Sequence, residues 1–399
     1  MKKIYAIALA LVTAGSLLAC GGGGSASTTA SGTTAAAAAA AGTTAAGAAS
    51  ATKAAAGTTA AAAAAKLTSL KASGQPYAHT LPAWLAQKDG MFKQAGMDFD
   101  IVFFTGGAPQ NEALGAGEWE VGTYGAPPAV TAGVHYGIHV IGFGAPDDKA
   151  VTIWARPDSD IAKITGKIDK YPNIKGDAAS WKGKTVLCPT STTAHFTLIA
   201  TLKTMGLTTD DINLIDMSVP QAFTAFKAGQ ADIVCLWDPQ GFAAADEGWT
   251  NLSSSEAVGV SLPTAIVASD DAVKNKHAEI LEYMDAYLQE SEKYSKDLNA
   301  YGQAMKDIGD ENGVEQTLEA ATKSAANRPL QTLDDEIKNF SGAKGQSKAY
   351  KAMMDLADFF AYTGTIEQAD KTKLENSEFV DNQFIKELAK KYGKDFPEN

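Results

Sequence analysis

Short apolar runs alternate with helical patterns along the middle of the chain. Residues 99–104 and 121–125 have the composition of buried strands, and the stretch 111–117 between them has a helical pattern. Because strands that alternate with helices form β-α-β units, this rhythm predicts an α/β protein. The same patterns predict strands at 67–70, 185–188, 212–216 and 232–237, and helices at 81–90, 193–205 and 220–228.

Beyond residue 270 the apolar positions recur at helical spacing. Two such faces stand out, and each marks a helix that packs along one side. The first consists of Ile280, Leu281, Met284, Tyr287 and Leu288, and the second of Tyr350, Met353, Met354, Ala357 and Phe360. Residues 67–399 form a longer stretch than a single hydrophobic core usually holds, and their number suits two cores. We therefore expect two α/β lobes followed by a helical tail.

The first twenty residues indicate export. Lys2 and Lys3 precede an apolar run at 4–18 that is too short for a membrane-spanning helix and suits a signal peptide. Small Ala19 before Cys20, with leucines behind it, resembles the lipobox of bacterial lipoproteins. That resemblance implies removal of residues 1–19 and a lipid anchor on Cys20 in the cell membrane. The alternative is an ordinary secretory signal with a cysteine at its cleavage site.

Residues 20–66 have the composition of a linker. After Cys20 they consist almost entirely of Gly, Ala, Ser and Thr, and the motif GTTA recurs. Such a segment has little apolar surface to bury, so it cannot offset the entropy of ordering itself. We expect a tether between the lipid and the folded part.

Charge and cysteine usage exclude several classes of protein. The full chain carries a net charge of −12, and loss of the two N-terminal lysines leaves −14, from 32 basic and 46 acidic residues. A nucleic-acid-binding protein would normally carry a basic face, so this acidic balance argues against one.

Cys188 and Cys235 lie in apolar runs, so we expect buried free thiols, or alternatively a disulfide between neighbouring strands. They do not have the spacing of metal ligands, and we expect no metal or cofactor.

A series of motifs occurs in order along the folded part. The first group is DGMFKQAGM at 89–97, TGGAP at 105–109, EALGAGE at 112–118 and GAPPA at 125–129. The second is WKGKTV at 181–186, TTAH at 192–195, AFTAFKAG at 222–229, LWDP at 236–239 and FVDNQFI at 379–385. Together they resemble the solute-binding proteins of ABC transporters for aliphatic sulfonates, taurine and nitrate.

The resemblance implies a type II periplasmic-binding-protein fold. Residues 67–155 and 264–399 would form the first lobe and 156–263 the second, with crossovers near 153–156 and 264–267. It further implies a monomeric extracytoplasmic protein that delivers a small organic anion to a permease and ATPase. Taurine or another aliphatic sulfonate is the favoured ligand. Nitrate, a nitrogen heterocycle such as a thiamine-pyrimidine precursor, or a sensory role without transport are the alternatives.

The candidate ligand site gathers polar residues where strands meet helices. The start of a helix offers free N–H groups and a partial positive charge, which suits an anion. We expect one side of the site at 191–195 and the other at the two Gly-rich turns; N-capping is the alternative role for the threonines. The residues are Ser191, Thr192, Thr193, Ala194 and His195 on one side, and Thr105, Gly106, Gly107, Thr123 and Tyr124 on the other.

Three further side chains complete the candidate site. Trp237 would form a wall, Asp238 would accept a hydrogen bond from a ligand amine or else cap a loop, and His79 follows the first strand. Arg156 and Arg328 are the two arginines of the chain. With so few, we expect no arginine clamp on the ligand unless Arg156 reaches inward.

Enzymes also occur on the fold that the resemblance implies. Such an activity needs a nucleophile, and Cys188 with His195 seven residues on is the suggestive pair. We interpret the chain as a binding protein and not as an enzyme.

Overall fold

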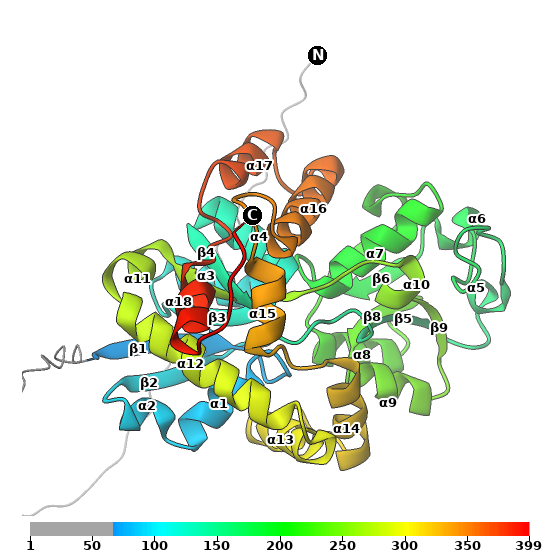
Figure 1. Ribbon diagram of the computed structural model, residues 1–399. Coiled ribbons are helices and arrows are strands. Elements are labelled where there is room, and N and C mark those ends of the chain that lie inside the picture. Colours follow the sequence, from blue (N-terminus) through cyan, green and yellow to red (C-terminus); the bar gives the residue numbers. More distant parts are fainter. Residues whose placement is uncertain (1–66, 399) are drawn as a thin grey trace, which may run out of the picture. The chain divides into compact units, whose positions relative to one another are not determined.

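The computed structural model describes residues 67–398. It contains two five-stranded mixed sheets, each with helices packed around it (Figure 1). The first sheet has the order β2 (Asp98–Phe103), β1 (Ser69–Gly74), β3 (Val121–Gly125), β10 (Thr264–Ser269) and β4 (Ile138–Phe143). The second has the order β7 (Asn213–Asp216), β6 (Thr185–Cys188), β8 (Ile233–Trp237), β5 (Val151–Ala155) and β9 (Thr250–Ser254). The expected two α/β lobes are confirmed.

Both sheets follow the same plan. Three neighbouring strands are parallel, and a fourth runs antiparallel between the third and the edge strand. The antiparallel strands are β5 and β10, the first strands after the chain passes from one sheet to the other. The lobe boundary predicted from the sequence placed β5 in the first lobe, whereas this strand pairs with β8 and β9 in the second sheet. Its apolar run is compatible with either sheet, and only the pairing decides between them.

The helices that follow the parallel strands lie close to the expected positions. After the first sheet's strands come α1 (Leu81–Lys88), α2 (Met91–Gln94), α3 (Gly107–Gly115) and α4 (Ala126–His135). In the second lobe are α5 (Asp160–Lys163), α6 (Ala178–Trp181), α7 (Thr193–Thr204), α8 (Val219–Lys227), α9 (Gln240–Asp246) and α10 (Ser255–Val258). Helix α4 carries two prolines directly after its first residue, Ala126. Proline is tolerated in a first turn because the N–H groups there have no intrahelical partner.

The helical tail is present as expected. It comprises α11 (Asp270–Asn275), α12 (His277–Tyr294), α13 (Leu298–Glu311), α14 (Leu318–Asn327), α15 (Leu333–Phe340), α16 (Lys348–Thr363), α17 (Gln368–Glu375) and α18 (Gln383–Lys391). Its two predicted faces are buried except for the half-buried Leu281 and Tyr350. Ile280, Met284 and Tyr287 in α12 and Met353 and Phe360 in α16 are inaccessible to solvent.

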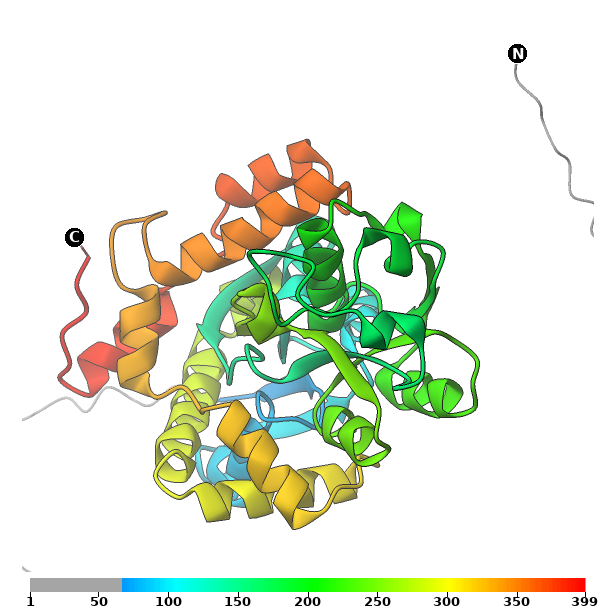
Figure 2. The ribbon, with the colours of Figure 1, turned by 90° about the vertical axis from the view of Figure 1, so that its right-hand side faces the viewer.

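The tail contacts the second lobe as well as the first. Helix α16 lies beside α7, where the rings of Phe359 and Phe196 are 4.5 Å apart (Figures 1 and 2). The last residue of α14 reaches the end of β8 through a hydrogen bond from Asn327 to Asp238. The tail therefore connects the two lobes on two sides.

Among residues 67–398 no helix is long and apolar enough to span a membrane. Cys188 and Cys235 are both buried and unbridged, which confirms the favoured interpretation of buried free thiols. Cys20, the expected lipidation site, and the expected tether at 20–66 lie outside the described residues.

Candidate functional site

A small cavity lies where the ends of strands from both sheets meet. In α/β sheets ligands bind at the carboxyl ends of the strands. The space that the centre of a water molecule can occupy in this cavity is about 20 Å³. The two lobes therefore lie close together here. It is lined by Gln75, Tyr77, His79, Gly107, Gly125, Pro128, Asp147, Thr192, Thr193, Trp237 and Arg328.

The lobes touch at the end of β3. A Cβ atom on Gly125 would lie 2.8 Å from the Cγ2 methyl of Thr193, which is the first residue of α7. That separation is shorter than a carbon–carbon contact allows, so a side chain at Gly125 would push the lobes apart or displace Thr193. The GAPPA motif thus contributes a close approach between the lobes.

The start of α7 presents donors to the cavity. Thr192 is the N-cap, and its Oγ1 accepts from the N–H of His195 at 3.4 Å and donates to the carbonyl of Pro189 at 2.7 Å. The alternative role of a capping threonine is therefore confirmed for Thr192. The amides of Thr193 and Ala194, in the first turn, have no intrahelical partner and add to the positive end of the helix.

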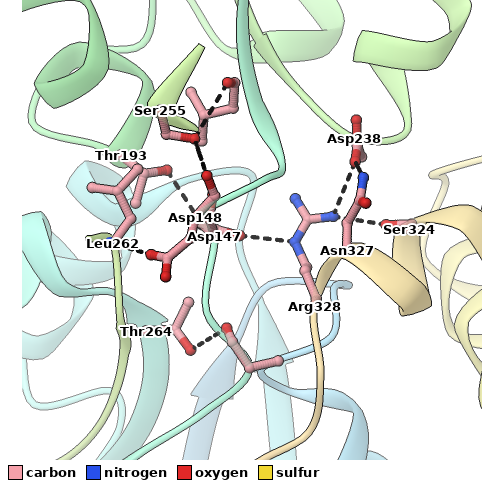
Figure 3. Close-up of polar contacts among 12 residues, drawn as sticks. Asp147, Asp148, Thr193, Asp238, Ser255, Leu262, Thr264, Ser324, Asn327 and Arg328 are labelled. Atoms are coloured by element: carbon pink, nitrogen blue, oxygen red, sulfur yellow. Dashed lines mark hydrogen bonds and ion pairs between the residues drawn. The ribbon is translucent and has the colours of Figure 1, made fainter. Parts of the chain in front are cut away.

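Arg328 reaches the cavity from the loop after α14, fully buried (Figure 3). Its Nε donates to Asp147 Oδ1 at 2.8 Å and its Nη1 to Ser324 Oγ at 2.7 Å, while Asp238 Oδ2 lies 3.9 Å from Nη1. Nη2 donates no hydrogen bond within residues 67–398. Nε and Nη1 are thus held by protein, and Nη2 is available to a ligand.

The sequence predicted no arginine clamp on the ligand, but Arg328 lines the cavity. The reason is distance in sequence: Asp147 and Arg328 are 181 positions apart and meet only in the fold. Arg156, the arginine considered earlier, does not reach inward. Its guanidinium donates to the carbonyls of Ala231 and Phe226 at 2.8 Å each and lies 4.3 Å from the ring centre of Phe226.

Asp238 is near the cavity but does not line it. Its Oδ2 accepts from Asn327 Nδ2 at 2.9 Å. Burial raises the pKa of Asp238 to about 6, although Arg328 opposes that rise. Asp147 is the acidic residue that lines the cavity, and its second oxygen accepts from Thr193 Oγ1 at 3.3 Å.

His79 lines the cavity as a neutral imidazole. Burial lowers its pKa to about 4, so the ring is uncharged at pH 7. Neither ring nitrogen makes a hydrogen bond within the described part of the chain. A neutral imidazole offers one donor and one acceptor, and both are available to a ligand.

The structure separates the remaining predicted residues into two groups. His79, Gly107, Thr192, Thr193 and Trp237 line the cavity. The others do not, for local reasons: Thr105 is exposed and Gly106 half-buried before α3, the Thr123 hydroxyl bonds to Thr80, and the Tyr124 ring packs edge-on against Trp119. Ser191, Ala194 and His195 belong to the start of α7 without lining it; the backbone of Ser191 is left-handed (φ 56°), and its N–H donates to His195 Nδ1.

Six lining residues were missed from the sequence: Gln75, Tyr77, Gly125, Pro128, Asp147 and Arg328. Some signals were present. Gln75 and Tyr77 follow the first strand just as His79 does, and arginine is rare in this chain, so a lone arginine before Pro329 was a candidate. Asp147 carried no such signal, because surface loops commonly contain aspartate.

The thiol of Cys188, the suggested nucleophile, is not activated. Cys188 is buried, its Sγ lies 3.8 Å from the carbonyl of Pro189, and burial raises the pKa of the thiol well above its usual value. The thiol is therefore protonated at neutral pH. Among residues 67–398 no group of side chains has the arrangement of a metal site.

Comparisons with known proteins agree with this architecture. The sequence pattern of the NMT1/THI5-like family matches residues 78–296. The chain belongs to this family. One relative is a protein of Brachyspira hyodysenteriae named as an ABC transporter periplasmic binding protein. It is 31% identical to this chain over 318 residues, which are 80% of this chain and 89% of the Brachyspira protein. The taurine-binding periplasmic protein of Escherichia coli is 27% identical over 205 residues, 50% of this chain and 58% of that one.

Solved structures share the fold of this NMT1/THI5-like protein. The alkanesulfonate-binding protein SsuA from Xanthomonas axonopodis pv. citri, bound to MOPS, has a TM-score of 0.60 and 21% sequence identity. The similarity covers 75% of this chain and 94% of that one. The fold is that of the periplasmic binding proteins, as the motifs predicted.

Proposed function

We propose that this NMT1/THI5-like protein is the solute-binding component of an ABC importer and captures a small organic anion between its lobes. Taurine or another aliphatic sulfonate is the favoured ligand. The names of the Brachyspira and Escherichia coli relatives support the class of protein, and the arrangement of the cavity supports the class of ligand.

The observation that carries the proposal is that protein groups among residues 67–398 bind only two of the three guanidinium nitrogens of Arg328. Nε binds Asp147 and Nη1 binds Ser324, so Nη2 remains for the ligand. A sulfonate oxygen is a suitable acceptor for Nη2, and the free amides at the start of α7 would bind a second oxygen.

The acids beside Arg328 favour a ligand that also carries a positive charge. Asp147 and Asp238 both lie within 4 Å of the guanidinium, so its charge is already balanced by protein. A bare anion would add an uncompensated negative charge to a buried site, which is costly. An aminosulfonate adds none, and its ammonium group would lie near Asp147.

The proposal includes a location and a domain organisation. Residues 1–19 would be a signal peptide, Cys20 the lipidated first residue, and 20–66 the tether that holds the lobes outside the cytoplasmic membrane. The permease and ATPase of the importer would be the partners, with the binding protein acting as a monomer.

Calorimetric titration of residues 67–399 tests the ligand class. The panel is taurine, ethanesulfonate, nitrate, sulfate and a hydroxymethylpyrimidine. We expect taurine to bind most tightly and sulfate to bind weakest. Preference for nitrate or for the pyrimidine would overturn the assignment of the ligand while leaving the importer role in place. The absence of binding by every compound would count against both.

A further inference from the structure

A series of hydrogen-bonded side-chain amides leads from the middle of β3 to the cavity. Gln110 of α3 is fully buried, and its Nε2 donates to the backbone carbonyl of Thr123 at 3.2 Å and to Ser73 Oγ at 2.9 Å. Its Oε1 accepts from Gln75 Nε2 at 3.1 Å. Gln75 lines the cavity, whereas Gln110 does not.

The carbonyl of Thr123 determines which end of each side-chain amide in this series donates and which accepts. A backbone carbonyl only accepts hydrogen bonds, so the group of Gln110 that faces it must be the NH₂. The Gln110 oxygen then faces Gln75, and only the NH₂ of Gln75 can donate to it. The Gln75 oxygen is left without a hydrogen bond from residues 67–398, and it is the group that the side chain can offer to a ligand.

The surroundings keep Gln110 in this orientation. A Cβ atom on Gly122 would lie 2.4 Å from Ser73 Oγ and 3.2 Å from Gln110 Nε2, so the glycine makes room for the carboxamide against β3. The Nε1 of Trp119 donates to the Gln110 backbone carbonyl at 2.8 Å. The Gln75 backbone N–H donates to Thr80 Oγ1 at 3.0 Å, so the backbone of Gln75 is fixed as well.

We propose that Gln110 is a positioning residue that turns the Gln75 amide oxygen toward the ligand and so selects ligands that carry a hydrogen-bond donor. The inference rests on the proposed function, since the donor would be the ammonium group of an aminosulfonate. Gln110 itself touches no ligand. Its contribution is to exclude the flipped Gln75 amide, which would present an NH₂ and suit an acceptor instead.

The test compares Gln110→Met with a matched control, Ser73→Ala. Methionine fills a similar volume but cannot fix the Gln75 amide, which is then free to present either end. Ser73→Ala removes one acceptor of Gln110 and leaves Thr123 to set the polarity. Calorimetric titrations with taurine and ethanesulfonate give the preference for the amine-bearing ligand in each protein, and thermal melting confirms that each variant is folded.

We expect Gln110→Met to lower the preference for taurine by about tenfold, the effect of one hydrogen bond to a charged group, with ethanesulfonate affinity within threefold of the wild type. Ser73→Ala should keep the wild-type preference. An unchanged preference in folded Gln110→Met would overturn the inference. If that variant does not fold, Gln75→Met should show the same loss of preference, and retention of the preference there would overturn it equally.

A second measurement separates this inference from the identity of the ligand. If the wild type binds neither compound, the proposed ligand class fails, but the Gln75 side-chain amide can still be followed by NMR. We expect its NH₂ protons to exchange slowly in the wild type and in Ser73→Ala and quickly in Gln110→Met. Equal exchange in all three proteins would show that Gln110 does not hold Gln75.

Discussion

Glu336 of α15 is bound to the edge strand of the first sheet, where its Oε2 accepts from the backbone N–H of Phe143 at 2.8 Å. The residue is fully buried, and burial raises its pKa to about 8. The carboxyl group is therefore mostly protonated at neutral pH.

This contact predicts a pH-dependent stability. In the unfolded chain Glu336 titrates near 4.5, and in the folded protein near 8. Below pH 4.5 the group is protonated in both states. As the pH rises from 4.5 to 8 the unfolded state alone ionises, so Glu336 makes the free energy of unfolding fall by roughly 1.4 kcal/mol per pH unit at most.

Glu336→Gln should remove this dependence. Urea unfolding at pH 5 and pH 8 would show a smaller loss of stability across the range in the variant than in the wild type. Glu256→Gln, at an exposed position in α10, is the control and should behave as the wild type. Equal losses in wild type and Glu336→Gln would contradict the burial argument.

Gly125→Ala should hinder closure of the lobes. The added methyl group would lie 2.8 Å from Thr193 Cγ2, and overpacking of this kind costs about 1–3 kcal/mol. The proposed site lies between the lobes, so we expect a ligand to favour the form in which they are closed. The affinity should therefore fall by roughly tenfold. Small-angle scattering should then show less compaction with ligand than in the wild type. Gly106→Ala, where a Cβ meets nothing within 4 Å, is the control; equal affinities in the two variants would count against the interlobe contact.

Arg328→Lys should weaken taurine binding by about 1–3 kcal/mol. A lysine keeps the charge beside Asp147 but has no additional nitrogen in the position of Nη2 for the ligand. The matched control is Arg156→Lys, whose guanidinium binds the carbonyls of Ala231 and Phe226 away from the cavity. Calorimetry should separate the two variants. Full taurine affinity in folded Arg328→Lys would place the anion elsewhere.

Cys20→Ser should release the full-length protein from the membrane fraction. The thiol is the proposed site of lipidation, and serine cannot form the thioether. Fractionation after a high-salt wash measures the distribution, and the thermal stability of the lobes should be unchanged. A variant that still sediments with membranes would disprove the anchor.

The local pattern of the sequence determined most of the elements and part of the site. Apolar runs and helical spacing depend on neighbouring residues, so β3, β6, α7 and the buried face of α12 were predictable. The ordered motifs identified the fold, and Thr192 and Thr193 were found because the start of a helix after a strand is a local feature.

Only the tertiary structure decided which residues face one another across the lobes. Strand β5 belongs to the second sheet because of its pairing with β8, which no run of apolar residues specifies. Arg328, Asp147 and Asp238 come from three distant segments and converge on one buried cluster. The orientation of Gln75 likewise depends on a carbonyl of another strand, and hydrogen-bond polarity of that kind is set by atoms in space and not by their order along the chain.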